Sequence, residues 1–373
     1  MSLFIGLLSG TSMDGIDAGL VDFGVPNPML VASRVYPIPA ELRERLMMAC
    51  GHVQRDQDYV DEIGSLDGLL GHLFADAVMA LLEQTGNRPD DVRAIGSHGQ
   101  TIRHRPRNQP PFTLQIGDPN IIAERTGITT VADFRRRDMA AGGEGAPLVP
   151  AFHQFVFQQL GESRVVANIG GMANITILSA KSSEPITGFD TGPGNVLLDV
   201  WAALHLGAPM DTDGRWAGEG KTHEGLLRRL RNDDYFSAPP PKTAGRERFN
   251  LDWLHRCIAD IRPTPVPADI QRTLCELTVT TLRDAIMTHA PACREVLVCG
   301  GGARNPMLLQ GLKERLPHCL VDTTHRYGIH PDWVETMAFA WLAERRLLGL
   351  PGNVPSVTGA RHPVVLGAVY PGR

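Results

Sequence analysis

The chain has 373 residues, of which 43% are hydrophobic and 21% charged, as in an ordinary globular protein. Lysine and arginine number 36 and aspartate and glutamate 41, so the net charge of −5 gives no basis for a nucleic-acid surface. No apolar run reaches the roughly 18 residues of a membrane helix, and residues 3–8 are too short and lack the basic lead of a signal peptide. We therefore expect a soluble cytoplasmic protein of enzyme size, with two or three domains and no membrane or nucleic-acid partner.

The first predicted elements form a β-hairpin. Apolar residues 4–8 and 16–23 read as strands, and the turn between them is rich in glycine, serine and threonine. Residues 165–168 and 175–178 repeat this arrangement. Two such hairpins about 160 residues apart predict a duplicated architecture of two related α/β halves.

Hydrophobic periodicity predicts further helices and strands, and a loose segment predicts the boundary between the two halves. Listed along the chain, they are a helix over 66–82, strands over 94–96, 131–134 and 295–299, a helix starting at Asn305 and a last helix over 332–348. We expect the N-terminal domain to span 1–138, joined by part of the C-terminal segment, and the C-terminal domain to span 139–373. The loose, glycine-rich residues 140–150 are the expected crossing region.

Glycine-rich turns follow several of these strands. Backbone amides at such turns bind phosphate, helped by serine and threonine hydroxyls. The turns cover residues 10–15, 169–174 and 300–302, and a fourth, 190–195, leads into a helix. For any one turn, simple hairpin closure is an equal explanation, whereas the set favours a nucleotide cleft. The P-loop, the Gly-x-Gly-x-x-Gly run and the protein-kinase motifs are absent.

An ordered set of motifs resembles the anhydro-N-acetylmuramic acid kinases. The matching motifs are SGTSMDGID (9–17), GSHGQT (96–101), ADFRRRD (132–138), GGEGAPLVP (142–150), NIGG (168–171), GFDTGPGN (188–195), KTAGRE (242–247) and VCGGGARN (298–305). The matches extend from about residue 5 to the C-terminal LGAVYP and so cover essentially the whole chain. Met13, where leucine is common in the family, is a minor departure.

This resemblance implies two related actin-like (ribonuclease H-like) α/β domains with an ATP cleft between them. It implies a bacterial enzyme of peptidoglycan recycling that uses ATP and water to open the 1,6-anhydro bridge of anhydro-N-acetylmuramic acid and to phosphorylate O6. The product is N-acetylmuramic acid 6-phosphate. Mg²⁺ is expected to bind through the phosphates, and a homodimer is a further expectation.

The resemblance also assigns residues. Asp190, at a strand end, matches the catalytic base that activates water, and Asn195 is better placed than Asp190 to cap the helix that follows. The residues expected to bind ATP are Gly10, Thr11, Ser12, Met13, Asp14, Gly15, Ile16, Asp17, Asn168, Gly170, Gly171, Gly300, Gly301 and Gly302. For the last three glycines, close strand–helix packing is an equally good explanation.

The expected substrate site is less specific. Its residues are His98, Gln100, Arg135, Arg136, Arg137, Asp138 and Glu335. An arginine fork suits the lactyl carboxylate of the substrate, although a basic triplet is usually a solvated run. Asp138 could accept a sugar hydroxyl. Glu335 is equally well explained as a surface residue, and His98 as a structural histidine.

Three other functions compete with this interpretation. A related small-molecule kinase would phosphorylate its substrate without hydrolysis. A nucleotide-switched, chaperone-like protein would need a separate peptide-binding module, for which the chain has no spare length. A serine hydrolase using Ser97 and His98 lacks the nucleophile-elbow motif, and adjacent residues are poorly placed for a triad.

Overall fold

The computed structural model describes residues 2–10, 13, 15–51, 59–181 and 183–373. The chain forms two compact units, the first made of Met1–Val156 with Trp333–Arg373 and the second of Phe157–Asp332. The C-terminal segment thus completes the first unit. This unit also continues past residue 138 and contains residues 140–150, because the buried Asp138 binds Gly145 ahead of it and Asn353 and Thr358 in the C-terminal segment.

The first unit is built on a six-stranded sheet of order β13-β7-β4-β1-β2-β3. Its strands are β1 (Leu3–Ser9), β2 (Gly15–Asp22), β3 (Met29–Pro37), β4 (Val92–Ser97), β7 (Thr130–Ala132) and β13 (Ala368–Tyr370), and a separate hairpin pairs β5 (Gln100–Arg105) with β6 (Phe112–Ile116). Its helices are α1 (Ala40–Cys50), α2 (Tyr59–Thr85), α3 (Pro119–Thr126), α4 (Arg136–Ala140), α5 (Val149–Phe157), α13 (Val334–Leu347) and α14 (Pro355–Thr358). Helix α5 runs one residue into the second unit.

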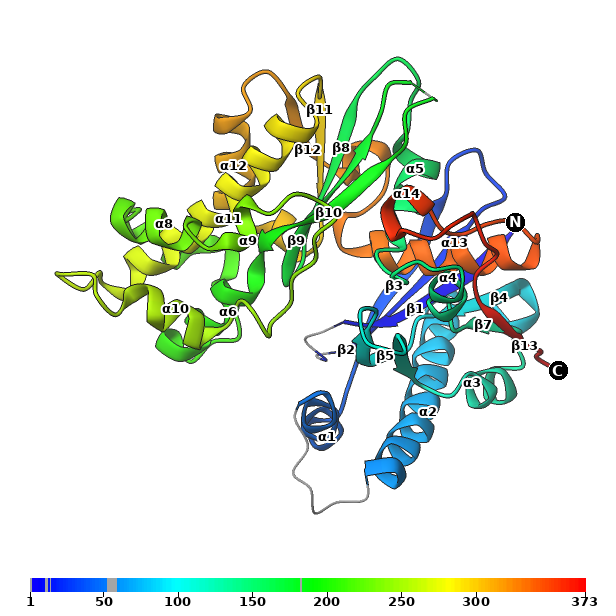
Figure 1. The fold of residues 1–373 in the computed structure, drawn as a ribbon. Helices are drawn as coiled ribbons and strands as arrows, with labels where there is room; N and C mark the ends of the chain where they lie inside the picture. Colours follow the sequence, from blue (N-terminus) through cyan, green and yellow to red (C-terminus); the bar gives the residue numbers. More distant parts are fainter. Residues whose placement is uncertain (1, 11–12, 14, 52–58, 182) are drawn as a thin grey trace. The chain divides into compact units, whose positions relative to one another are not determined.

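The second unit is built on a five-stranded sheet of order β10-β9-β8-β11-β12. Its strands are β8 (Arg164–Ile169), β9 (Met172–Leu178), β10 (Thr187–Pro193), β11 (Glu295–Cys299) and β12 (Leu320–Thr323). Its helices are α6 (Asn195–Leu206), α7 (Arg215–Glu219), α8 (Glu224–Arg231), α9 (Asp234–Ser237), α10 (Leu251–Ile258), α11 (Pro267–His289) and α12 (Pro306–Arg315). The long helix α11 is buried along most of its length in the core of this unit (Figure 1).

The two sheets share one topology. In each, the first strand pairs antiparallel with the second and the second antiparallel with the third. The first strand also runs parallel to the fourth, which runs parallel to the fifth. This repeated order confirms the predicted duplication and the actin-like α/β class of the fold.

Two glycines allow a helix to pack unusually close to the first sheet. Helix α13 lies against β1 and β4 (Figure 1). A Cβ atom at Gly6 would collide with the backbone carbonyl of Thr336, and one at Gly96 with that of Phe339. Every residue of β1 and every residue of β4 except Arg93 is buried, as expected of central parallel strands covered by helices.

Helix α2 is more apolar than sequence analysis indicated. Among the described residues it is the one helix long and apolar enough to cross a membrane by length and composition, and 50% of its most apolar stretch is buried. Leu70, Phe74 and Leu81 on this helix are fully buried in the core of the first unit. A core helix of a globular protein has the same properties.

Candidate active site

Asp190 lies on the edge strand β10, within the strand and not at its end. The register of β10 against β9 shifts between Asp190 and Gly192, which is a β-bulge. The Asp190 Oδ2 atom accepts a hydrogen bond of 3.0 Å from the Ala244 amide, while no hydrogen bond of a described residue reaches Oδ1. Burial raises the pKa of Asp190 to about 6, although the Ala244 amide lowers it.

The helix that follows Asp190 does not use it as a cap. Helix α6 has Gly194 at its N-cap position, with no side-chain hydrogen bond there. The Asn195 side chain, the better candidate for a cap, instead donates to the Ile169 carbonyl at 3.2 Å. Asp190 is therefore available for another role.

Around the first hairpin turn, the described residues pack in the core or pair with a neighbouring strand. The Met13 amide donates to the Gly10 carbonyl at 3.2 Å, and the Met13 side chain is buried in the core, as is Ile16. Gly15 and Asp17 are paired with β3. A Cβ atom at Gly15 would meet Val35, so this glycine is needed for strand packing and not for an unusual φ. Thr11, Ser12 and Asp14, which carry the predicted phosphate contacts, lie outside the described residues.

The second hairpin turn joins β8 to β9. The amides of Asn195 and Val196, at the start of α6, donate to the carbonyls of Gly170 and Gly171 at 2.8 and 3.1 Å. The helix N-terminus is thus bound by the turn itself and does not provide these two amides to a ligand. No atom lies within 4 Å of a Cβ built on Gly171, so a ligand can approach its backbone closely.

The third glycine turn, residues 300–302, packs against strand β8. A Cβ atom at Gly300 would collide with the Asn168 side chain, and one at Gly302 with Ile169. Gly300 also has a φ of 79°. Close packing of the turn on β8 therefore accounts for Gly300 and Gly302, while Gly301 has more open surroundings.

The three arginines of the basic triplet differ sharply. Arg136 is exposed and its Nε atom lies 2.8 Å from the Asp133 carboxylate, and Arg137 is exposed as well. Arg135 instead turns toward the protein, donating to His98 Nε2 at 2.8 and 3.0 Å and to the Gly145 carbonyl at 2.8 Å. Burial lowers its pKa to about 10, and it forms no ion pair with a described residue.

His98 is held in one neutral tautomer. Its Nδ1 atom lies 3.0 Å from the Gly99 carbonyl, which only accepts, so the proton is on Nδ1 and Nε2 accepts from Arg135. Burial, followed by the Arg135 charge, lowers the pKa of His98 to about 3. His98 therefore orients Arg135 and carries no charge near neutral pH.

Asp138 is fully buried, and both of its oxygens are in use. Oδ1 accepts hydrogen bonds from Asn353 at 2.6 Å and Thr358 at 2.8 Å, and Oδ2 accepts one from the Gly145 amide at 2.8 Å. Since Arg135 binds the Gly145 carbonyl, Asp138 stabilises the loop that supports Arg135.

Gln100 and Glu335 lie in contrasting surroundings. Gln100 is 1% exposed, and its buried Oε1 atom has no hydrogen-bond partner in the described part of the chain. Glu335 is exposed in the first turn of α13, where its carboxylate favours the charged form of Arg135. Glu335 is therefore a surface residue, and its charge still acts on the half-buried Arg135.

Two sets of contacts to the candidate site residues are not predicted by the sequence patterns. The first comes from the backbone of the KTAGRE motif, whose Ala244 amide holds Asp190. The second is the Asn353–Thr358 pair, which binds Asp138 from more than 200 positions away in the sequence. The described residues hold no group of three or more His, Cys, Asp or Glu that could bind a metal ion.

The repeated sheet, with glycine turns after its strands, defines an actin-like α/β protein. The chain matches the family model described as anhydro-N-acetylmuramic acid kinase over residues 2–372. It is 50% identical to the anhydro-N-acetylmuramic acid kinase of Xanthomonas campestris pv. campestris (strain 8004), covering 99% of this chain and 97% of that protein. It is 49% identical to that of Vibrio cholerae serotype O1, covering 99% and 98%.

Among solved structures, component A of (R)-2-hydroxyglutaryl-CoA dehydratase from Acidaminococcus fermentans aligns with a TM-score of 0.45 at 11% identity, covering 91% of this chain and 96% of that one. The matches to the family model and to its members show that the chain belongs to the anhydro-N-acetylmuramic acid kinase family and is a kinase.

Proposed function

We propose that this chain uses ATP and water to convert 1,6-anhydro-N-acetylmuramic acid into N-acetylmuramic acid 6-phosphate in peptidoglycan recycling. The observation that carries the chemistry is Asp190, a carboxylate on an edge strand with one oxygen held and the other available. Water loses a proton to Asp190 and bonds to the anomeric carbon, and the C1–O6 bond breaks. O6 bonds to the γ-phosphorus as the bond to ADP breaks.

The raised pKa of Asp190 supports its role as the base. A general base is most effective when its pKa lies near the working pH, and burial brings this carboxylate to about 6. It is then ionised at neutral pH and still basic enough to accept a proton in the transition state. The Ala244 amide restricts one oxygen, which favours proton transfer to Oδ1.

The ATP site is proposed for the hairpin turns. Thr11 and Ser12 would donate hydroxyl hydrogen bonds to the phosphates, and the backbone of their turn would donate amide hydrogen bonds. Gly171 leaves room for a phosphate beside the β8–β9 turn. Asp14, Asp17, Asn168 and the glycines around them complete the predicted set. Because the described residues offer no ready-made cage of metal ligands, Mg²⁺ bound mainly through the phosphates fits this chain, where it would neutralise their charge.

The substrate carboxylate is proposed to bind near Arg135. A desolvated guanidinium without an ion pair is unfavourable on its own and is stabilised when an anion binds. The unpartnered Gln100 Oε1 atom can accept a hydrogen bond from a sugar hydroxyl or amide. Glu335 is the remaining polar candidate at the sugar, whereas Asp138 is proposed to act through the loop it holds.

The test is product analysis in ¹⁸O-labelled water. The purified chain is incubated with ATP, Mg²⁺ and the anhydro sugar, and the product is identified by mass. We expect both water and phosphate to be added, with ¹⁸O on the sugar and none in the transferred phosphate. A phosphorylated sugar with its bridge intact would identify a related sugar kinase, and label appearing only in inorganic phosphate would identify an ATPase.

A further inference from the structure

The outer edge of β10 is covered at Asp190 by a single segment, residues 233–248. The Asp190 amide donates to the Lys242 carbonyl at 3.1 Å, and the Asp190 carbonyl accepts a hydrogen bond of 2.7 Å from the Tyr235 hydroxyl. The same segment supplies the Ala244 amide that holds Oδ2. The backbone and the carboxylate of one residue are thus held by three groups of one neighbouring segment.

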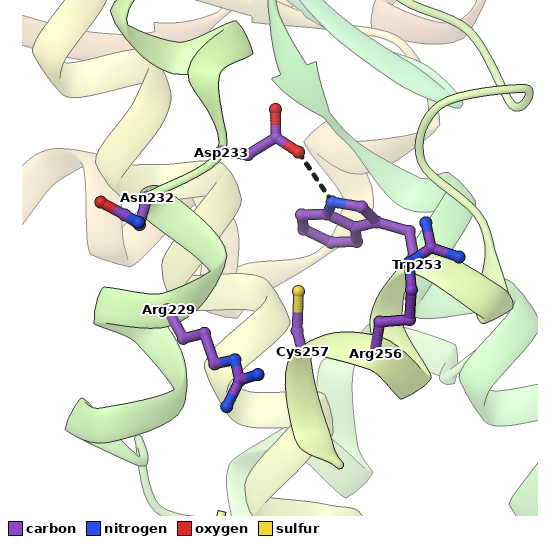
Figure 2. A pocket seen from close by; sticks show the side chains of 6 residues that line it. All are labelled: Arg229, Asn232, Asp233, Trp253, Arg256 and Cys257. Atoms are coloured by element: carbon purple, nitrogen blue, oxygen red, sulfur yellow. Dashed lines mark hydrogen bonds between the residues drawn. The ribbon is translucent and has the colours of Figure 1, made fainter. Parts of the chain in front are cut away.

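This segment is anchored independently of Asp190. The Asp233 carboxylate caps α9 through the Tyr235 amide at 3.0 Å and accepts a hydrogen bond of 2.8 Å from Trp253 Nε1. Arg248 forms an ion pair with Asp233. Figure 2 shows the Asp233–Trp253 hydrogen bond beside a pocket of about 400 Å³, which none of the proposed site residues lines.

Close packing also places Tyr235 against the strand. Helix α9 contacts β10, where Gly192 has a φ of 149° and a Cβ would lie 2.7 Å from the Phe236 ring. The Lys242 ammonium binds the carbonyls of Tyr235 and Phe236 at 3.1 and 3.3 Å and lies 4.8 Å from the centre of the Tyr235 ring. Tyr235 is only 5% exposed, so its hydroxyl has little freedom to leave the Asp190 carbonyl.

We propose that Tyr235 is a positioning residue for the hydrolytic phosphorylation, acting through its hydroxyl on the Asp190 carbonyl while the Ala244 amide holds Oδ2. The proposal rests on the proposed role of Asp190 as the base. Asp190 is paired with Asn174 of β9 just before the register shifts, and its amide and carbonyl bond to Lys242 and Tyr235, so the Tyr235 hydroxyl fixes the backbone of Asp190 at the point where regular pairing is interrupted. A displacement of the base by a fraction of an ångström misaligns it with the attacking water, which lowers the rate of the chemical step.

The test is Tyr235→Phe, which removes the hydroxyl and keeps the ring. We expect kcat to fall about 3- to 10-fold, the effect of one lost hydrogen bond. KM for ATP and for the anhydro sugar should stay within about twofold, because Tyr235 touches neither ligand in this proposal. An unchanged kcat in the folded variant would overturn the proposal.

A matched control is Tyr327→Phe, in the same unit. Its hydroxyl donates to the Glu295 carboxylate at 2.8 Å, at the opposite end of β11 from the Gly300 turn. This variant also loses one phenol hydrogen bond, here a stronger one to a carboxylate, and should keep wild-type kcat. An equal fall in kcat in both variants would mean that Tyr235 acts only through general stability, which would also overturn the proposal.

Introducing Tyr235→Phe into the Asp190→Asn variant distinguishes a failure of this proposal from a failure of the proposed function. Tyr235 acts through the base, so Tyr235→Phe should not lower the residual rate of Asp190→Asn further. A further 3- to 10-fold loss there would show that Tyr235 acts independently of Asp190. If Asp190→Asn itself keeps the wild-type rate, the base assignment fails, and the two failures are thereby distinguished.

Should Tyr235→Phe fail to fold, Arg248→Met provides the second variant. Arg248 is 38% exposed and holds Asp233, so its loss loosens the segment without opening the core. We expect kcat to fall about two- to threefold with both KM values unchanged. A wild-type kcat in this variant would count against the proposal, and a fall confined to KM would overturn it.

Discussion

Strands β3 and β10 occupy the same place in two sheets of the same order, yet their outer edges differ. Each is the third strand of its unit and lies at a sheet edge. Beyond its pairing with β2, β3 forms no backbone hydrogen bond with a described residue, and its Met29, Val31 and Val35 side chains are 51%, 41% and 56% exposed. On β10, the edge at Asp190 is covered by the segment from α9 to Arg248. In the proposed mechanism the repeated sheet is therefore a scaffold, and the segment that covers one edge of it positions the base.

The two units also differ in which charged side chain of the candidate site is desolvated: an arginine in the first unit and an aspartate in the second. Burial lowers the pKa of Arg135 in the first unit, against the charges of Glu335 and Asp138, and raises that of Asp190 in the second, against the hydrogen bond from the Ala244 amide. By contrast, the buried Arg164 and Glu295 side chains, at the starts of β8 and β11, form an ion pair with Nε and Oε2 2.5 Å apart. Unpaired buried charges are unfavourable for folding and are typical of sites that bind or transform a ligand.

The largest effect is expected from Asp190→Asn, which removes the base and keeps the shape of the side chain. The amide cannot accept the proton of water, so kcat should fall on the order of 10²–10⁴-fold. ATP affinity, measured by calorimetry, should be unchanged. Asp260→Asn, an exposed residue paired with Arg229, is the control and should keep full activity. Turnover near the wild-type level in Asp190→Asn would refute the assignment of the base.

The second prediction concerns Arg135→Gln in the first unit. Loss of a charged hydrogen bond to the lactyl carboxylate should raise KM for the anhydro sugar about 10- to 100-fold. A sugar analogue without the lactyl group should be affected much less. Arg136→Gln, at an exposed residue paired with Asp133, is the matched control and should have little effect. Equal losses on both sugars would mean that Arg135 acts on the fold or on ATP.

The third prediction is a pH dependence of stability caused by Asp190. Its pKa is raised on folding from 3.8 to about 6, so the folded state binds the proton more tightly than the unfolded state. Ionisation therefore costs stability as pH rises from about 4 to 6, and the cost is complete above that range. Asp190→Asn should stabilise the protein by about 1–3 kcal/mol at pH 8 and by nothing below pH 4.

Urea unfolding of Asp190→Asn and wild type across pH 3.5–8 checks this prediction. The same ionisation predicts that wild-type turnover falls as the pH drops below about 6, since the base becomes protonated. A variant that is no more stable than wild type at pH 8 would show that Asp190 is not desolvated in the folded protein.

Sequence patterns predicted the repeated hairpins well, because buried strands and glycine turns leave a strong local signal. Strand β11 was predicted with its observed bounds, and α12 and α13 within a few residues. Helix α11 was missed, although it is the long buried helix of its unit. Six of its 13 buried residues are polar, namely four threonines, Gln271 and Glu276, so its apolar periodicity is weak. Burial of such residues is decided by tertiary partners, such as the Pro193 carbonyl that accepts from Thr278.

The residues of the candidate site show the same division between local and distant signals, and their roles stay predictions. Asp190 and Arg135 stand in motifs that can be read locally. The partners that define their chemistry cannot, because Tyr235 and Ala244 reach Asp190 across about 50 residues and His98 reaches Arg135 across 37. For Asp138, the motif predicted a contact with the sugar. In the structure, its carboxylate instead accepts hydrogen bonds from Asn353 and Thr358, which are distant in the sequence.

The smallest effect is expected on the open edge, from Met29→Lys on β3. Met29 is half exposed, and lysine is the residue that natural proteins commonly place on exposed edge strands. Its long side chain can lie along the strand with the ammonium in water, so the free energy of unfolding should change by less than about 0.5 kcal/mol. Turnover and both KM values should match wild type, since no proposed site residue depends on Met29. A loss of turnover comparable to that of Tyr235→Phe would show that the edge of β3 serves catalysis as the edge of β10 does, and the contrast between the two strands would no longer hold.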